Sequence, residues 1–108
     1  MLLSTSQIHE GLQPLNGWTL SQDHACIEKT WQFKSFRLAM QFWNAVAELA
    51  EQRDHHPEFV SNYTKLCIRL TTHDAKGLTD KDLELAQDIE RMSNQPENRS
   101  IFGADMTA

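Results

Sequence analysis

Three of the five histidines lie in one stretch between Glu51 and Asp82, and their spacing is the first chemical signal in the sequence. His55 and His56 are adjacent and precede a proline, and His73 follows seventeen residues after His56. Imidazole titrates near neutral pH and can both give and take a proton, so such a cluster is a candidate for general acid/base catalysis. Imidazole is also a common metal ligand, so the surroundings must distinguish proton transfer from metal binding.

The composition describes one globular domain of ordinary size. A chain of 108 residues, 40% of them apolar, can bury a core without disulfides or metal ions. The formal net charge is −5 and the ten Lys and Arg residues are scattered, so nucleic-acid binding is not expected. Cys26 and Cys67 fall in strand-like segments, and we expect small buried side chains rather than a disulfide.

The N-terminus and the hydropathy give no sign of export or of membrane insertion. Met1-Leu2-Leu3 is followed at once by polar residues, which does not fit a signal peptide. No apolar run approaches the ~18 residues of a membrane helix. We therefore expect a cytoplasmic protein that does not bind membranes.

The segments around the histidines predict an α+β fold. Pro57 should end a long helix at or before His56, and Thr79 with Asp82 matches a capping box at the start of a later helix. His73 should point off the open face of the sheet or lie on the turn after a strand. The predicted order is a helix at 4–12, strands at 18–21 and 26–33, a helix at 35–52, strands at 58–60 and 63–72, and a helix at 79–92. This order indicates an antiparallel sheet of about four strands with helices on one face and a long central helix.

Two further predictions concern the long helix and the C-terminus. The helix at 35–52 has apolar residues on two sides, which indicates a subunit interface or a second helix of the same chain that covers the excess. After Ser93 the sequence turns polar. We therefore expect one domain over residues 1–93 and a loose polar tail over 94–108.

The central stretch resembles the signature of the pterin-4a-carbinolamine dehydratase family. That signature has an acidic residue, three further positions, His-His-Pro, an aromatic residue, a later His and a later Asp. In this chain the matching residues are Glu51, His55, His56, Pro57, Tyr63, His73 and Asp82. The likeness extends roughly from Trp18 to Met92 and includes the Gly77-Leu78-Thr79 step.

The resemblance implies a specific reaction. The family dehydrates 4a-hydroxytetrahydropterin to the quinonoid dihydropterin, which completes the cofactor cycle of aromatic amino acid hydroxylases. It implies a homodimer or homotetramer, a pterin substrate, a hydroxylase as a possible partner, and neither a cofactor nor a metal. By the same likeness His55, His56 and His73 surround the pterin. Our hypothesis for their roles is that His55 and His73 form the acid/base pair and that His56 orients or binds the ring. The expected substrate-binding residues are Glu51, Trp18, Asp54, Pro57, Thr72 and Asp82.

Plainer interpretations exist for the same residues. A histidine pair at a helix C-terminus is favoured by the helix macrodipole alone, and the capping box alone explains Asp82. A metal site would need His55 and His73 to converge with Asp54 or Glu51. Two other functions also stay open. One is an oligomeric binding module that serves as the dimerisation partner of a transcription regulator, and the other is a dehydratase-like role in molybdopterin metabolism.

Overall fold

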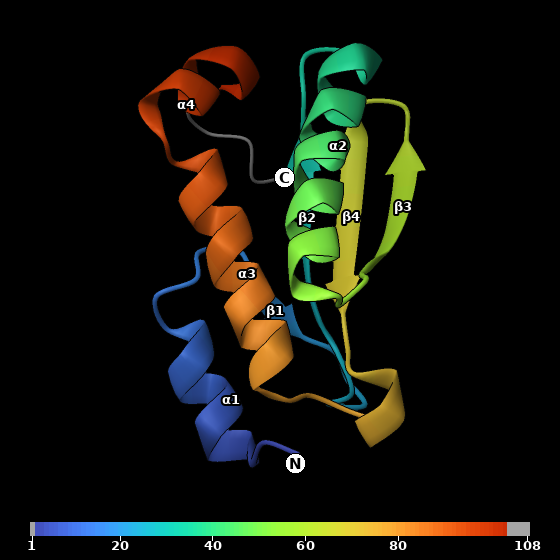
Figure 1. The fold of residues 1–108 in the computed structure, drawn as a ribbon, viewed down its shortest axis with the longest axis vertical. Coiled ribbons are helices and arrows are strands. Elements are labelled where there is room, and N and C mark those ends of the chain that lie inside the picture. The colour runs from blue at the N-terminus through green and yellow to red at the C-terminus, as the bar shows by residue number, and fades with distance from the viewer. Residues whose placement is uncertain (1, 104–108) are drawn as a thin grey trace.

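The computed structural model describes residues 2–103, which form one layer of helices on one face of an antiparallel sheet (Figure 1). The sheet has four strands in the order β1-β2-β4-β3, and all three pairs of neighbours are antiparallel. The α+β prediction is therefore confirmed. The elements are α1 (Thr5–Leu12), β1 (Thr19–Leu20), β2 (Ile27–Gln32), α2 (Phe36–Arg53), β3 (Glu58–Asn62), β4 (Lys65–Leu70), η1 (His73–Ala75), α3 (Asp80–Ser93) and α4 (Pro96–Phe102).

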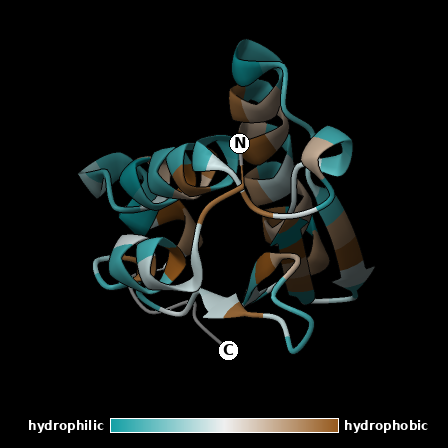
Figure 2. Cartoon of the chain, turned by 90° about the horizontal axis from the view of Figure 1, so that it is seen from below, coloured by the Kyte–Doolittle hydropathy of each residue, from teal (hydrophilic) through white to brown (hydrophobic). Residues whose placement is uncertain are grey.

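The core lies between the sheet and helices α2 and α3. Both helices bury apolar residues against the sheet, and much of their outward-facing surface is hydrophilic (Figure 2). Strand β4 alternates as the sequence predicts, with Leu66, Ile68 and Leu70 fully buried. Fully buried residues of the two helices that face them are Ala39, Phe42, Val46, Leu85, Ala86 and Ile89.

Strand β2 alternates between buried and partly exposed residues, and Lys29 occupies a buried position although a lysine breaks the apolar pattern of the sequence. Lys29 is only 5% exposed and lies on the core face between Ile27 and Trp31. Its ammonium group lies 2.8 Å from Glu90 Oε2 on α3, so the buried charge has a partner. A buried charge is tolerated when it is paired and hydrogen-bonded, which explains a lysine on the inner face of a strand.

Helix α2 begins and ends where local chemistry predicts. The Ser35 hydroxyl accepts the amide hydrogen of Leu38 at 3.2 Å and caps the first turn. At the other end Asp54 adopts a left-handed conformation with φ of 51° and closes the last turn. Leu38 and Leu49 pack against the chain's own core, so part of the second apolar side is covered internally.

The hairpin of β3 and β4 differs from the prediction at Tyr63. The sequence places Tyr63 in a strand, because aromatic residues favour strands, but it lies in the turn with φ of 55°. The register pairs Asn62 with Lys65, so Tyr63 and Thr64 form a two-residue loop. Such loops use positive φ values, and the hairpin geometry therefore overrides the strand preference of Tyr63.

The C-terminal prediction is wrong for residues 96–102. These residues form α4, with Pro96 at its start, and Phe102 is buried. The Phe102 ring packs edge-on against Phe42 at 5.3 Å and Phe33 at 6.2 Å between centroids. The domain therefore extends past Ser93, while residues 104–108 of the predicted tail lie outside the described part of the chain. Within residues 2–103 no helix has the length and apolar character to cross a membrane.

Candidate functional site

The end of α2 sends the two adjacent histidines in different directions. Asp54 reverses the chain with its left-handed backbone, and its amide hydrogen-bonds to the carbonyls of Ala50 and Glu51. After this turn His55 is buried and His56 is exposed. Adjacent residues on extended backbone point to opposite sides, so the two imidazoles contact different parts of the structure.

His55 joins a buried network around Asp82. Its Nε2 lies 2.6 Å from Asp82 Oδ1, and the imidazole is 9% exposed while Asp82 is 0% exposed. Asp82 Oδ2 accepts the Thr72 hydroxyl at 2.8 Å and the Thr79 amide hydrogen at 3.0 Å. The Thr72 and Thr79 hydroxyls are 2.7 Å apart. This network joins the end of α2, the end of β4 and the start of α3.

His56 pairs with the helix that precedes it. Its Nε2 lies 2.6 Å from Glu51 Oε1, and both side chains are largely exposed. The chain reversal at Asp54 makes this contact possible, because it folds His56 back against the last turn of α2. Glu51 is therefore placed to orient one imidazole, and that imidazole is His56.

His56 and His73 line the same cleft. His73 begins the 3₁₀ turn η1 that follows β4, and it is exposed. The cleft has a volume of about 140 Å³ and is lined by Ala25, Cys26, His56, Glu58, Arg69, Thr71 and His73. His55 lines a different hollow with Gln52, Arg53, Lys81 and Glu84. The structure therefore brings two of the three predicted histidines together in one cleft and places the third in another hollow.

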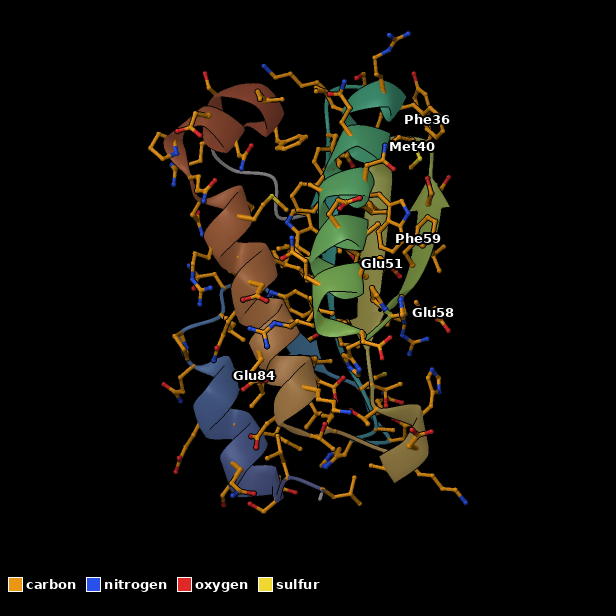
Figure 3. The ribbon with its side chains drawn as sticks, viewed as in Figure 1. Phe36, Met40, Glu51, Glu58, Phe59 and Glu84 are labelled. Carbon is orange, nitrogen blue, oxygen red and sulfur yellow. The ribbon has the colours of Figure 1, made fainter. Side chains whose placement is uncertain are left out.

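A row of charges crosses the open face of the sheet, and two of its residues, Glu58 and Arg69, line the cleft. The register places Arg69 of β4 between Glu28 of β2 and Glu58 of β3. Arg69 Nε lies 2.9 Å from Glu28 Oε2, and Arg69 Nη1 lies 3.5 Å from Glu58 Oε1. The pKa of Arg69 is raised above its ordinary value, mainly by the neighbouring Cys26 side chain and next by the Glu28 carboxylate, so the guanidinium stays charged. Glu51 and Glu58 lie on the same side of the molecule (Figure 3).

Sequence reasoning did not place Arg69 or Glu58 in the site. The alternation of β4 correctly turns Arg69 away from the core, which was the available signal. The missing information was the register of β3 on β4, which brings Glu58 beside Arg69. Both residues line the cleft together with His56 and His73.

Other residues expected near the substrate do not line this cleft. Trp18 is buried in the core, where its Nε1–H donates to Glu90 at 3.0 Å and its ring packs edge-on against Trp31. Neither Asp54 nor Pro57 is among the residues that line the cleft. Thr72 borders a larger hollow of about 520 Å³ with Asp74, Ala75, Thr79, Asp80 and Lys81, beside the same 3₁₀ turn.

The arrangement suits proton transfer better than metal binding. Two imidazoles share one open cleft, and imidazole is a common general acid or base in enzymes. Across the described residues, no three His, Cys, Asp or Glu side chains gather closely enough to hold a metal ion. The cleft therefore contains two candidate acid/base groups, His56 and His73, next to the ion pairs of Arg69.

Sequence comparisons point to one family. A family model described as pterin 4 alpha carbinolamine dehydratase matches residues 1–92. A protein of Rhizobium rhizogenes is 42% identical over 89 residues, which cover 82% of this chain and 88% of that protein. A protein of Sulfurisphaera tokodaii is 41% identical over 90 residues, which cover 83% and 95%. Both names provisionally assign their proteins to the pterin-4-alpha-carbinolamine dehydratases.

Solved structures show the same fold. A transcriptional coactivator/pterin dehydratase from Brucella melitensis superposes with a TM-score of 0.82 at 31% identity, covering 87% of this chain and all of that chain. A pterin dehydratase-like RuBisCO assembly factor of the alpha-carboxysome superposes with a TM-score of 0.62 at 18% identity, covering 74% and 93%. The second likeness concerns the fold alone.

Proposed function

Because this chain belongs to the pterin 4 alpha carbinolamine dehydratase family, we propose that it dehydrates a 4a-hydroxytetrahydropterin to a quinonoid dihydropterin and water. The observation that carries the proposal is the cleft that His56 and His73 share. A bare histidine pair would be weak support. The shared cleft, the complete signature and the family match together make a coherent case.

The proposed reaction asks for one acid and one base. The C4a–O bond breaks and the hydroxyl leaves as water, so its oxygen must receive a proton. The N5–H proton is removed, and its electron pair forms the N5=C4a double bond. No electron is gained or lost overall. A positioned acid or base of this kind contributes about 10²–10⁴-fold to the rate.

The cleft favours His56 and His73 as the proton-transfer pair. Both line it, and Glu51 orients His56 from 2.6 Å. The pairing of His55 with His73 that the sequence suggested stays a prediction, and so does a contact of Trp18 with the pterin. In the proposed site His55 is not part of the proton-transfer pair, and its hydrogen bond with Asp82 fixes its position.

Single alanine variants of the three histidines test these roles. We expect His56→Ala and His73→Ala to lose about 100-fold or more in kcat, as the removal of an acid or base should. His9→Ala on α1 is the matched control, since His9 is exposed and lies outside the cleft. Equal and small losses in all four variants would reject histidine catalysis.

The proposed biological setting is the recycling of a tetrahydropterin cofactor for an aromatic amino acid hydroxylase in the cytoplasm. The cleft does not specify the substituent at C6 of the pterin, so a dehydratase-like role on a molybdopterin-related compound is the alternative substrate. Turnover of pterins that differ only at C6 separates the two. We expect a small C6 substituent to be accepted, and a strict requirement for a molybdopterin-type side chain would contradict the recycling role.

We also propose that the protein is a homodimer or homotetramer. Phe36, Met40 and Phe59 lie along the side of α2 that borders β3 (Figure 3). Phe36 is 49% exposed, and Trp43 stacks on Phe59 with 3.9 Å between ring centroids. Strand β3 is an edge strand, and an exposed apolar edge is commonly covered by another chain.

Sedimentation velocity tests this surface. Phe59→Lys should shift the protein toward monomer, while Ile101→Lys, at an apolar and exposed position on α4, should leave the assembly intact. A Phe59→Lys protein with the same sedimentation coefficient as the parent would contradict the proposed interface.

The same apolar surface favours a second function, that of a binding module for a regulatory protein. The Brucella melitensis relative carries both coactivator and pterin dehydratase in its name. A protein that binds a partner through this surface but does not turn over the pterin would support the second function over the first.

A further inference from the structure

Asp82 is the most deeply buried acid near the histidines, and no ligand can touch it. Its exposed fraction is 0%, yet its carboxylate accepts three hydrogen bonds, from His55, Thr72 and Thr79. Helix capping requires only the bond from the Thr79 amide. The bonds to His55 and Thr72 are additional, and both lead toward residues of the site.

The contact between His55 and Asp82 determines the proton on His55 once the form of Asp82 is stated. Asp82 Oδ2 accepts from two donors, the Thr72 hydroxyl and the Thr79 amide, so neither contact needs a hydrogen on the carboxyl. We take Asp82 as the carboxylate, which is the ordinary form of this side chain at neutral pH. An ionised carboxylate has no hydrogen to donate, so the 2.6 Å contact with Oδ1 needs a hydrogen on His55 Nε2. Neutral His55 is then the Nε2–H tautomer, and its Nδ1 is left as the basic nitrogen.

The bond to Thr72 reaches the loop that carries His73. The Thr72 amide donates to the Gly77 carbonyl at 2.9 Å, and the Gly77 amide donates back at 3.3 Å. The Ala75 amide also donates to the Thr72 carbonyl at 3.1 Å. Thr72 thus closes the base of the 3₁₀ turn that begins at His73, and its hydroxyl is fixed by Asp82.

We propose that Asp82 is a positioning residue that fixes the Nε2–H tautomer of His55 and, through Thr72, the turn that carries His73. The kinetic part of this inference rests on the proposed function, because it assumes that the histidines act on a pterin. One carboxylate then orients two of the three histidines without touching the substrate. A role limited to capping would leave both the tautomer and the turnover unchanged.

Asp82→Asn is the decisive variant because it keeps the size of the side chain. If its amide carbonyl replaces Oδ2, its NH₂ group faces His55 Nε2 and donates to it, which moves the imidazole hydrogen to Nδ1. Asp80→Asn is the matched control, since Asp80 is an exposed acid in the same first turn of α3. Thr72→Val removes only the hydroxyl and isolates the link to the His73 turn.

Two readouts are needed, and the first does not depend on activity. Long-range ¹⁵N–¹H NMR should show His55 as the Nε2–H tautomer in the parent protein and in Asp80→Asn, and as the Nδ1–H tautomer in Asp82→Asn. The second readout is turnover of 4a-hydroxytetrahydropterin. Asp82→Asn should lose about 10–100-fold in kcat with KM within about threefold, as part of the 10²–10⁴-fold that acid/base groups contribute. Thr72→Val should lose less, and Asp80→Asn nothing.

The outcomes separate the proposals. An Nδ1–H tautomer of His55 in the parent protein would overturn the role of Asp82, as would equal turnover by Asp82→Asn and Asp80→Asn. A parent protein that shows the Nε2–H tautomer but turns over no pterin would keep the link between Asp82 and His55 and reject the proposed function. Urea unfolding of each variant shows that the tautomer is compared between folded proteins.

Discussion

The buried ion pair between Lys29 and Glu90 makes the most specific stability prediction for this fold. Lys29 is 5% exposed and Glu90 14% exposed, and their charged atoms are 2.8 Å apart. Glu90 Oε2 also accepts the Trp18 indole hydrogen at 3.0 Å, and the Lys29 ammonium lies 5.1 Å from the centre of the Trp31 ring. We choose the variant Lys29→Met, which keeps an unbranched side chain only one heavy atom shorter and removes its charge.

The expected loss follows from the carboxylate left behind. Breaking a buried pair by removing one partner costs about 3–5 kcal/mol, because the other charge stays buried without compensation. Glu90 keeps one donor in Trp18 and is slightly exposed, so the lower end, about 3 kcal/mol, applies. At about 4 °C per kcal/mol for a domain of this size, Tm should fall by roughly 12 °C.

A double-mutant cycle identifies the cause of the loss. Lys29→Met with Glu90→Gln removes both charges and leaves an amide oxygen for the Trp18 indole. The double variant should therefore lose only about 1 kcal/mol, less than Lys29→Met alone. Arg53→Met is the control for an ion pair whose cation is exposed, since Arg53 is 38% exposed, and it should cost no more than about 1 kcal/mol.

Urea unfolding followed by tryptophan fluorescence gives the free energies. A Lys29→Met protein that loses less than about 1 kcal/mol would refute the reasoning, since that is the value of an exposed pair. Additive losses in the double variant would refute it as well, because they would show that the two side chains do not interact.

Two further predictions concern α4 and the acid range. Phe102→Ala should lower the free energy of unfolding by about 2–3 kcal/mol, because a buried aromatic ring is removed from a terminal helix, whereas a loss no larger than that of exposed Ile101→Ala would mean that α4 does not stabilise the core. Arg53 donates to Asp88 and holds the pKa of that carboxyl below its ordinary value of 3.8, so this pair stabilises the fold above that pH and the contribution is lost as pH falls through the lowered pKa. Asp88→Asn should therefore be less stable than the parent at pH 7, and the difference should shrink as pH falls below 3.8, whereas a difference that does not shrink in acid would contradict the assignment.

Local signals in the sequence predicted the elements that hold the histidines. The capping box at Thr79 and Asp82 and the helix stop before Pro57 depend on neighbouring residues alone, and both appear in the structure. The alternation of β4 likewise fixed which side chains face the core. These features need no knowledge of the rest of the fold.

Features that depend on how strands pair or how a helix packs on the core were missed. Tyr63 has the preference of a strand residue, but the pairing of Asn62 with Lys65 makes it a turn residue. The same register brings Glu58 beside Arg69 in the cleft. In α4 Phe102 is the buried residue and its apolar neighbour Ile101 is exposed, so no periodicity revealed that the segment docks on the core.

The histidine cluster shows both the reach and the limit of sequence reasoning. Spacing and resemblance singled out His55, His56 and His73, but not which of them share a surface. That depends on the left-handed turn at Asp54, which sends His55 inward and leaves His56 beside Glu51. Helix geometry alone could not predict that turn, because it follows the last residue of the helix.

We propose that this protein dehydrates a 4a-hydroxytetrahydropterin with histidines and without a metal. The most direct measurement follows the ultraviolet decay of freshly generated 4a-hydroxytetrahydropterin with the parent protein, with a chelator added, and with His73→Ala. We predict that the protein accelerates the decay, that the chelator does not change the acceleration, and that His73→Ala loses it. No acceleration by the parent protein would contradict the account, and acceleration lost to the chelator would contradict its metal-free chemistry.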